Sequence, residues 1–177
     1  QLFSLHGHSK DALAKTQLGA WEYDIVGAWY KCNMTDIMAA IGLEQLKRYD
    51  GLLERRKEII CRYDKMCDAL GVAHLTHFTE EYNSSGHLYL TRIPGATDEV
   101  RREIIIKLAE MGVSTNVHYK PLPMMTAYKD MGWDIADFPN AYNYYENLIT
   151  LPLHTKLSDD DVDYIIECFE KVVKEYL

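Results

Sequence analysis

The 177-residue sequence lacks the short motifs by which many catalytic sites are recognised. It contains no Gly-x-Ser-x-Gly, no phosphate-binding P-loop, no Gly-x-Gly-x-x-Gly and no His-Glu-x-x-His. Each of these motifs fixes a nucleophile, a phosphate cradle or a metal ligand at a set spacing. The chain therefore offers no catalytic residue that can be named from a motif.

Positive charge and long apolar runs are also scarce. The formal net charge is -8, whereas a nucleic-acid binder needs a basic face to neutralise phosphates. No apolar run approaches the roughly 20 residues that are needed to span a bilayer. The sequence therefore predicts neither a nucleic-acid partner nor a membrane span.

Cysteine is sparse and forms no Cys-x-x-Cys pair. The sequence also shows no signal peptide, so we expect free thiols in a reducing cytoplasm. Cys32 precedes an expected helix, where exposure would lower the pKa of its thiol, but we favour a small residue packed near the helix start. The four cysteines are Cys32, Cys61, Cys67 and Cys168.

The seven histidines do not predict a metal site. The closest pairs are His6 with His8 and His74 with His77. Neither pair has an acidic or cysteine ligand at zinc spacing, so we expect surface or loop histidines. The acidic run 159–161 follows Ser158, and capping of a helix explains it.

A long helical run dominates the first half of the chain. It begins near Thr35, is apolar on almost every side over 37–43, and continues as a single apolar stripe to a helix end at Gly71. Asp50-Gly51 is the expected break. The missing initiator Met and the lack of periodicity over 1–30 suggest a fragment whose upstream half is absent.

Strands and helices alternate in the second half. We expect strands over 87–93, 113–119 and 149–151, and helices over 98–112 and 158–175. This order predicts a small α/β domain with a mixed or antiparallel sheet.

Two groups of residues are candidates for ligand binding. Lys31, Asn33 and Thr35 surround a helix start, where cationic and amide donors beside free N–H groups suit an anion; the alternative is a capped helix with Lys31 in solvent. His118 and Tyr119 end an expected strand and enter a proline loop, a common place for ligand-facing side chains. The alternative there is a buried tyrosine and a surface histidine.

Several blocks together resemble the DegT/StrS family of pyridoxal-phosphate (PLP) sugar aminotransferases of fold type I. The blocks run in family order over essentially the whole chain, and the helix block is the most specific. They are "LHGHSKDA", "YKCNMTDIMAAIGLEQLKRYDGLLERRKEIICRYD", "HLYLTRI", "GVSTNVHYKPL", "FPNAYNYYENLITLPLH" and "LSDDDVDYIIE".

The resemblance implies a small C-terminal α/β domain over 34–177, with a long helical spine and a short, mainly antiparallel sheet covered by helices. Residues 1–33 would be an arm left over from a large PLP-binding domain. The Schiff-base lysine would lie upstream of "HG", and Lys10, Lys15 and Lys31 stand in the wrong context to replace it. The isolated fragment is therefore expected to be inactive.

The resemblance also implies partners and site residues. Members are homodimers that move an amino group, usually from glutamate, to a nucleotide-linked keto sugar. Lys31 or Asn33 would reach the PLP phosphate of the other subunit, and His118 and Tyr119 would lie near substrate. The alternative from another class is a non-catalytic α/β module for interaction or regulation.

Overall fold

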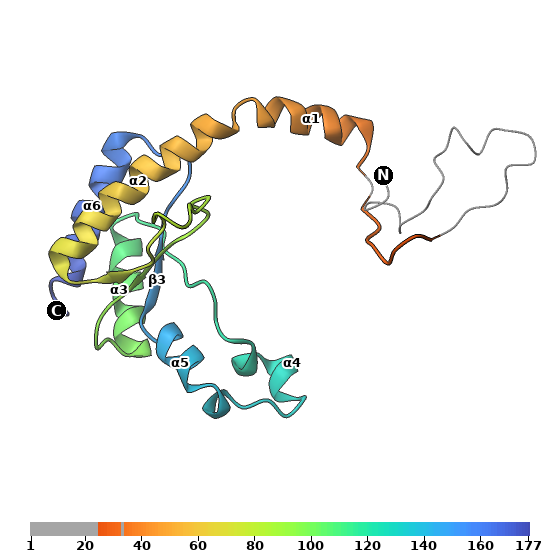
Figure 1. Cartoon of the computed structure of the whole chain (residues 1–177). Coiled ribbons are helices and arrows are strands. Elements are labelled where there is room, and N and C mark those ends of the chain that lie inside the picture. The colour runs from red at the N-terminus through yellow and green to blue at the C-terminus, as the bar shows by residue number, and fades with distance from the viewer. Residues whose placement is uncertain (1–24, 33) are drawn as a thin grey trace, which may run out of the picture. The chain divides into compact units, whose positions relative to one another are not determined.

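The computed structural model describes residues 25–32 and 34–177 (Figure 1). The chain divides into two compact units, 1–49 and 50–177. Most of the expected arm over 1–33, including Asn33, lies outside the described residues. The expected domain boundary between residues 33 and 34 stays a prediction.

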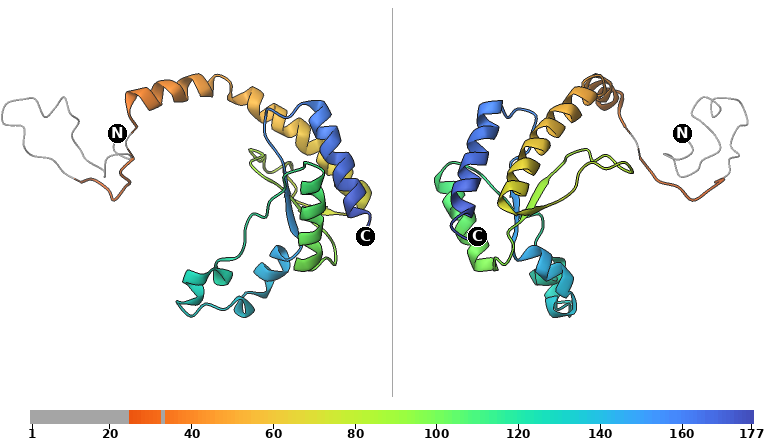
Figure 2. Two further views of the ribbon diagram at one scale, coloured as in Figure 1. Left: turned by 180° about the vertical axis from the view of Figure 1, so that it is seen from behind. Right: turned by 60° about the vertical axis from the view of Figure 1, so that its left-hand side comes forward.

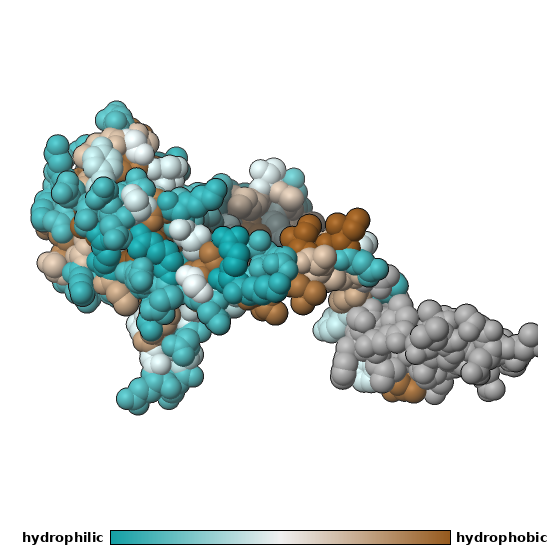
Figure 3. All heavy atoms as spheres, turned by 90° about the horizontal axis from the view of Figure 1, so that it is seen from above, coloured by the Kyte–Doolittle hydropathy of each residue, from teal (hydrophilic) through white to brown (hydrophobic). Residues whose placement is uncertain are grey.

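Helix α1, Asp36–Leu46, is the main described element of the first unit. Thr35 caps it, because its hydroxyl accepts the Met38 N–H at 3.4 Å. None of its residues is buried, and apolar side chains gather on its surface (Figure 3). This exposure differs from the burial that the all-round apolar pattern predicts.

The helical run breaks earlier than expected. Helix α2, Tyr49–Leu70, begins only two residues after α1. The Arg48 N–H bonds the Gln45 carbonyl at 3.0 Å, which tightens the last turn of α1. Asp50 and Gly51 therefore lie in the first turn of α2 and form no break, because an acidic residue suits a helix N-terminus.

Helix α2 packs one face into the core and ends where the sequence predicts. At Gly71 the backbone φ is 69°, and the Val72 N–H bonds the Cys67 carbonyl at 2.9 Å. A residue without Cβ adopts this left-handed conformation at no steric cost. The buried residues of α2 are Ile59, Ile60, Tyr63, Met66 and Cys67.

Three short strands form an antiparallel sheet in the order β1-β2-β3. They are β1, Ala73–His74, β2, Tyr89–Arg92, and β3, Leu148–Leu151. In the register of β2 and β3, Tyr89 pairs with Leu151 and Arg92 with Leu148. The mainly antiparallel sheet is thus confirmed.

The strand expected over 113–119 is wrong as a strand. Only Asn116 forms an isolated antiparallel bridge, with Thr150 of β3. The Asn116 side chain accepts a hydrogen bond from the N–H of the next residue, Val117, at 2.7 Å. This N–H is therefore not available to bond a neighbouring strand. Prolines 121 and 123 then end any extended pairing.

Helices α3, Asp98–Glu110, and α6, Asp159–Val173, lie with α2 beside the sheet (Figure 2). The expected cap at Ser158 is confirmed, since Ser158 forms a capping box with Asp161, and Thr97 caps α3. Side chains from these helices and from the strands form one core, in which Ile104, Leu108 and Phe169 are fully buried.

Four short helices connect the Asn116 bridge to β3 and project away from the sheet (Figure 1). They are η3, Leu122–Met124, α4, Thr126–Lys129, η4, Ile135–Asp137, and α5, Pro139–Tyr145. In the part of the chain that the structure describes, no helix has the length and apolar character to cross a membrane.

Candidate functional site

The first candidate group lies at the start of α1. Lys31 is exposed, four residues before the N-cap Thr35, and Asn33 is outside the described residues. An ammonium group and the first N–H groups of an 11-residue helix suit a phosphate oxygen chemically. Asp36 in the first turn is the one opposing charge of α1 at this end. The donor set therefore fits a phosphate group.

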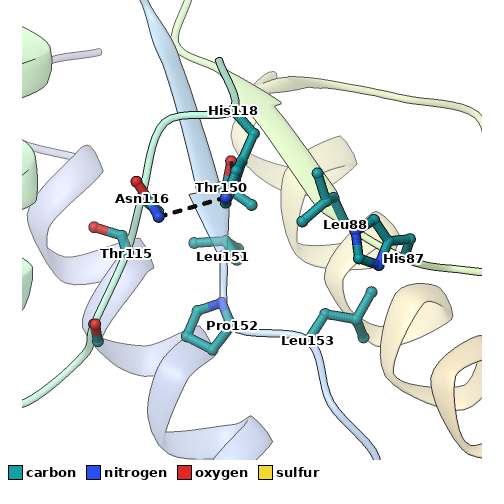
Figure 4. Close-up of a pocket in the computed structure, with 10 residues that line it drawn as sticks. His87, Leu88, Thr115, Asn116, His118, Thr150, Leu151, Pro152 and Leu153 are labelled. Atoms are coloured by element: carbon teal, nitrogen blue, oxygen red, sulfur yellow. Dashed lines mark hydrogen bonds between the residues drawn. The ribbon is translucent and has the colours of Figure 1, made fainter. Parts of the chain in front are cut away.

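The second candidate group lies at a pocket of about 260 Å³ in the second unit (Figure 4). Its walls come from the end of β3 and the residues after it, from the segment around Asn116 and from the two residues before β2. The apolar lining consists of Leu88, Leu151, Pro152 and Leu153. The polar lining consists of His87, Ser114, Thr115, Asn116, His118 and Thr150.

Two side chains hold the His118 ring in this pocket. Its Nδ1 lies 3.0 Å from the Thr150 hydroxyl, and its Nε2 lies 3.4 Å from the Asn116 amide nitrogen (Figure 4). Thr150 is buried, with 4% of its surface exposed. The segment and the strand are thus joined by side chains as well as by their backbone bridge.

Tyr119 follows His118 in the chain, and 69% of its surface is exposed. Its ring stands edge-on to the His118 ring, with the centroids 4.7 Å apart and an angle of 82°. A buried tyrosine beside a surface histidine is therefore not what the chain forms. Tyr119 presents its phenol to solvent, while His118 is only partly exposed.

Asn116 and Thr150 were not predicted from the sequence as residues of this site. Asn116 stands two residues before His118, the spacing at which side chains of an extended segment share a face. That spacing is the one signal that could have found Asn116. Nothing local marks Thr150, because its role depends on pairing between distant segments.

The structure also shows the surroundings of two other histidines and of Cys32. His74 lies 3.1 Å from both Asp64 and Asp68. His77 is only 5% exposed and stacks on Tyr89, so it is no surface histidine. The expected packing of Cys32 is also wrong, because this residue is exposed.

A family model decides the relationship of this chain to known proteins. The model of the DegT/DnrJ/EryC1/StrS aminotransferase family matches residues 1–170. The chain belongs to this family. The resemblance carried by the sequence blocks is thereby confirmed, as is the fold that it implies.

Two bacterial proteins illustrate what this chain is similar to. The spore coat polysaccharide biosynthesis protein SpsC of Bacillus subtilis is 38% identical over 178 residues, which cover 98% of this chain and 46% of SpsC. A UDP-4-amino-4,6-dideoxy-N-acetyl-beta-L-altrosamine transaminase of Campylobacter jejuni is 29% identical, over 88% of this chain and 42% of the transaminase. The chain thus spans less than half the length of these relatives.

Solved structures agree. The putative sugar aminotransferase Spr1654 from Streptococcus pneumoniae in its PMP-form is 59% identical, with a TM-score of 0.83, over 100% of this chain and 44% of that one. The same protein has also been solved in a PLP-form. Helicobacter pylori PseC, at 24% identity and a TM-score of 0.72, supports the fold alone.

Proposed function

We propose that this chain is the carboxy-terminal part of a PLP-dependent aminotransferase that transfers an amino group, from glutamate, to a nucleotide-linked keto sugar. The observation that carries the proposal is the family match over residues 1–170. A similar Streptococcus pneumoniae protein solved with PLP and PMP supports the cofactor. The transaminase named among the relatives supports the sugar nucleotide.

PLP supplies the electron sink for amino transfer when it is bound. In this proposal Lys31 or Asn33 and the first N–H groups of α1 hold its phosphate across a homodimer, through charge-assisted hydrogen bonds. The lysine that carries the cofactor belongs to the part of the relatives' length that this chain does not span. Residues 1–33 would complete the large domain, and 34–177 form the small one.

His118 and Tyr119 are the proposed substrate-facing residues. His118 lines the pocket, and the exposed phenol of Tyr119 beside it can hydrogen-bond sugar hydroxyls and pack on a sugar ring. The net charge of -8 and the four cysteines agree with an enzyme of the cytoplasm that does not bind nucleic acid.

The full-length protein tests this function directly. It is incubated with PLP, glutamate and a panel of keto sugar nucleotides. The panel includes the 4-keto compound whose amination would give UDP-4-amino-4,6-dideoxy-N-acetyl-beta-L-altrosamine. We expect 2-oxoglutarate and an aminated sugar nucleotide in equal amounts, and no product from the 177-residue chain alone. A full-length protein that binds PLP but aminates no panel member would contradict the proposal and favour a non-catalytic module.

A further inference from the structure

The orientation of the Asn116 side chain is fixed by its neighbour. The Val117 N–H meets Asn116 Oδ1 at 2.7 Å, and an N–H can only donate. The atom it meets is therefore the amide oxygen, which leaves the NH₂ group facing His118 Nε2 at 3.4 Å. Because an amide NH₂ has no acceptor, His118 Nε2 must accept this hydrogen bond.

The proton of a neutral His118 ring then resides on Nδ1. From there it is donated to the Thr150 hydroxyl oxygen at 3.0 Å (Figure 4). Both ring nitrogens are thus engaged by protein groups, one on each side of the bridge. A histidine held at both nitrogens has its ring plane and its tautomer set by its partners.

The backbone at this point is held in the same way. The Asn116 N–H bonds the Thr150 carbonyl at 3.1 Å, and the Thr150 N–H bonds the Asn116 carbonyl at 2.7 Å. This reciprocal pair places Asn116 and Thr150 directly opposite each other. His118, two residues further on, lies on the same face as Asn116.

Tyr119 depends on this arrangement for its position. The residue is 69% exposed, and its ring lies edge-on against the His118 ring, with the centroids 4.7 Å apart. An exposed tyrosine loses side-chain entropy when a ligand orders it, and a fixed neighbouring ring reduces that loss. We propose that His118 is a positioning residue, which Thr150 and Asn116 hold in the Nδ1–H tautomer so that Tyr119 stands ready to contact the sugar of the substrate.

This assignment rests on the proposed function and gives each of three residues a separate role in binding the substrate. Tyr119 contacts substrate, His118 orients Tyr119, and Thr150 orients His118. Since Thr150 acts only before the sugar arrives, its loss should weaken substrate binding more than it slows the chemical step.

The test compares Thr150→Val with Thr150→Ser in the full-length enzyme, with PLP and the best keto sugar nucleotide of the panel. Valine keeps the volume but removes the hydroxyl, whereas serine keeps the hydroxyl. We expect Thr150→Val to raise KM for the sugar nucleotide about tenfold, the scale of one hydrogen bond, with little change in kcat. Thr150→Ser should restore a KM near that of the unmodified enzyme.

Thr91→Val is the matched control. Thr91 is a buried threonine of the same sheet, and its hydroxyl donates to the Ile149 carbonyl at 2.9 Å. Removing the Thr91 hydroxyl should lower thermal stability, as removing the Thr150 hydroxyl should, but it should leave KM for the sugar nucleotide unchanged. In a Tyr119→Phe background, Thr150→Val should have almost no further effect on KM, because coupled residues do not add.

The outcomes separate the two proposals. Turnover by the unmodified enzyme with equal KM values for Thr150→Val and Thr150→Ser overturns the positioning role and leaves the aminotransferase. The same holds if Thr150→Val and Tyr119→Phe add independently. No turnover by the PLP-loaded, unmodified enzyme overturns the proposed function, and the positioning role falls with it.

Discussion

At the scale of single residues, His77 shows how burial changes the chemistry of a side chain. His77 is 5% exposed, its ring stacks on the Tyr89 ring with the centroids 5.7 Å apart, and its Nδ1 lies 3.1 Å from the Ser84 hydroxyl. Its Nε2 is buried and has no hydrogen-bond partner among the described residues. Burial lowers the pKa of His77 below its usual value, although nearby Asp64 opposes this shift.

The lowered pKa predicts a loss of stability in weak acid. The unfolded chain takes up a proton at His77 near pH 6.5, whereas the folded chain does so only at lower pH. The folded state therefore loses stability as the pH falls below about 6.5. Urea unfolding of the 177-residue chain at pH 7.5 and pH 5.5 should show a smaller difference for His77→Phe than for the unmodified chain.

His87→Phe is the control, because His87 is exposed. It should keep the pH dependence of the unmodified chain. Equal pH dependence in all three proteins would show that His77 does not contribute.

At the scale of elements, Arg101 joins α3 to the end of α5. Arg101 is 3% exposed, and its guanidinium donates to the Tyr145 carbonyl at 2.6 Å and also bonds Asp98. It lies 4.3 Å from the centre of the Tyr145 ring. A buried cation held by these three groups ties α3 to the segment that precedes β3.

Arg101→Met should lower the free energy of unfolding by about 3 kcal/mol, because it leaves Asp98 and the Tyr145 carbonyl without their buried partner. Arg102→Met is the matched control. Arg102 also bonds Asp98, at 2.7 Å, but its side chain is 66% exposed, and exposed ion pairs contribute little. Equal losses for both variants in urea unfolding would contradict the proposed tie.

Helix ends with a local capping signal were predicted well, whereas the strand expected over 113–119, which depends on a distant partner, was not. Thr97, Ser158 and Gly71 mark helix ends by their own chemistry, so those ends came directly from the sequence. Pairing of 113–119 with β3 depends on segments about 30 residues apart. The periodicity of one segment cannot show how many of its residues pair with a distant strand.

The candidate site was predictable to the same extent. The "HY" segment was found because a strand end before a proline loop is a local pattern. The contacts of His118 with Thr150 arise from the bridge, so only the structure shows them. Whether Lys31 or Asn33 binds phosphate stays a prediction.

At the scale of the whole molecule, α1 leaves apolar side chains uncovered. Ile37 is 76% exposed and Leu46 is 67% exposed, and none of the helix is buried. Soluble monomers rarely expose a contiguous apolar surface of this kind. In the proposed homodimer, which requires more chain than these 177 residues, such a helix would be covered. The 177-residue chain should therefore self-associate through α1.

Ile41→Glu tests this expectation by sedimentation velocity over a range of concentrations. Burying an isoleucine is worth about 1.5–3 kcal/mol, and about 1.4 kcal/mol corresponds to a tenfold change in affinity. The substitution should thus weaken self-association at least about tenfold. Ile106→Glu makes the same change on α3, where the side chain is 58% exposed against 59% for Ile41, and it should leave association unchanged. If the unmodified chain stays monomeric at every concentration, or if both variants weaken association equally, α1 is not the associating surface.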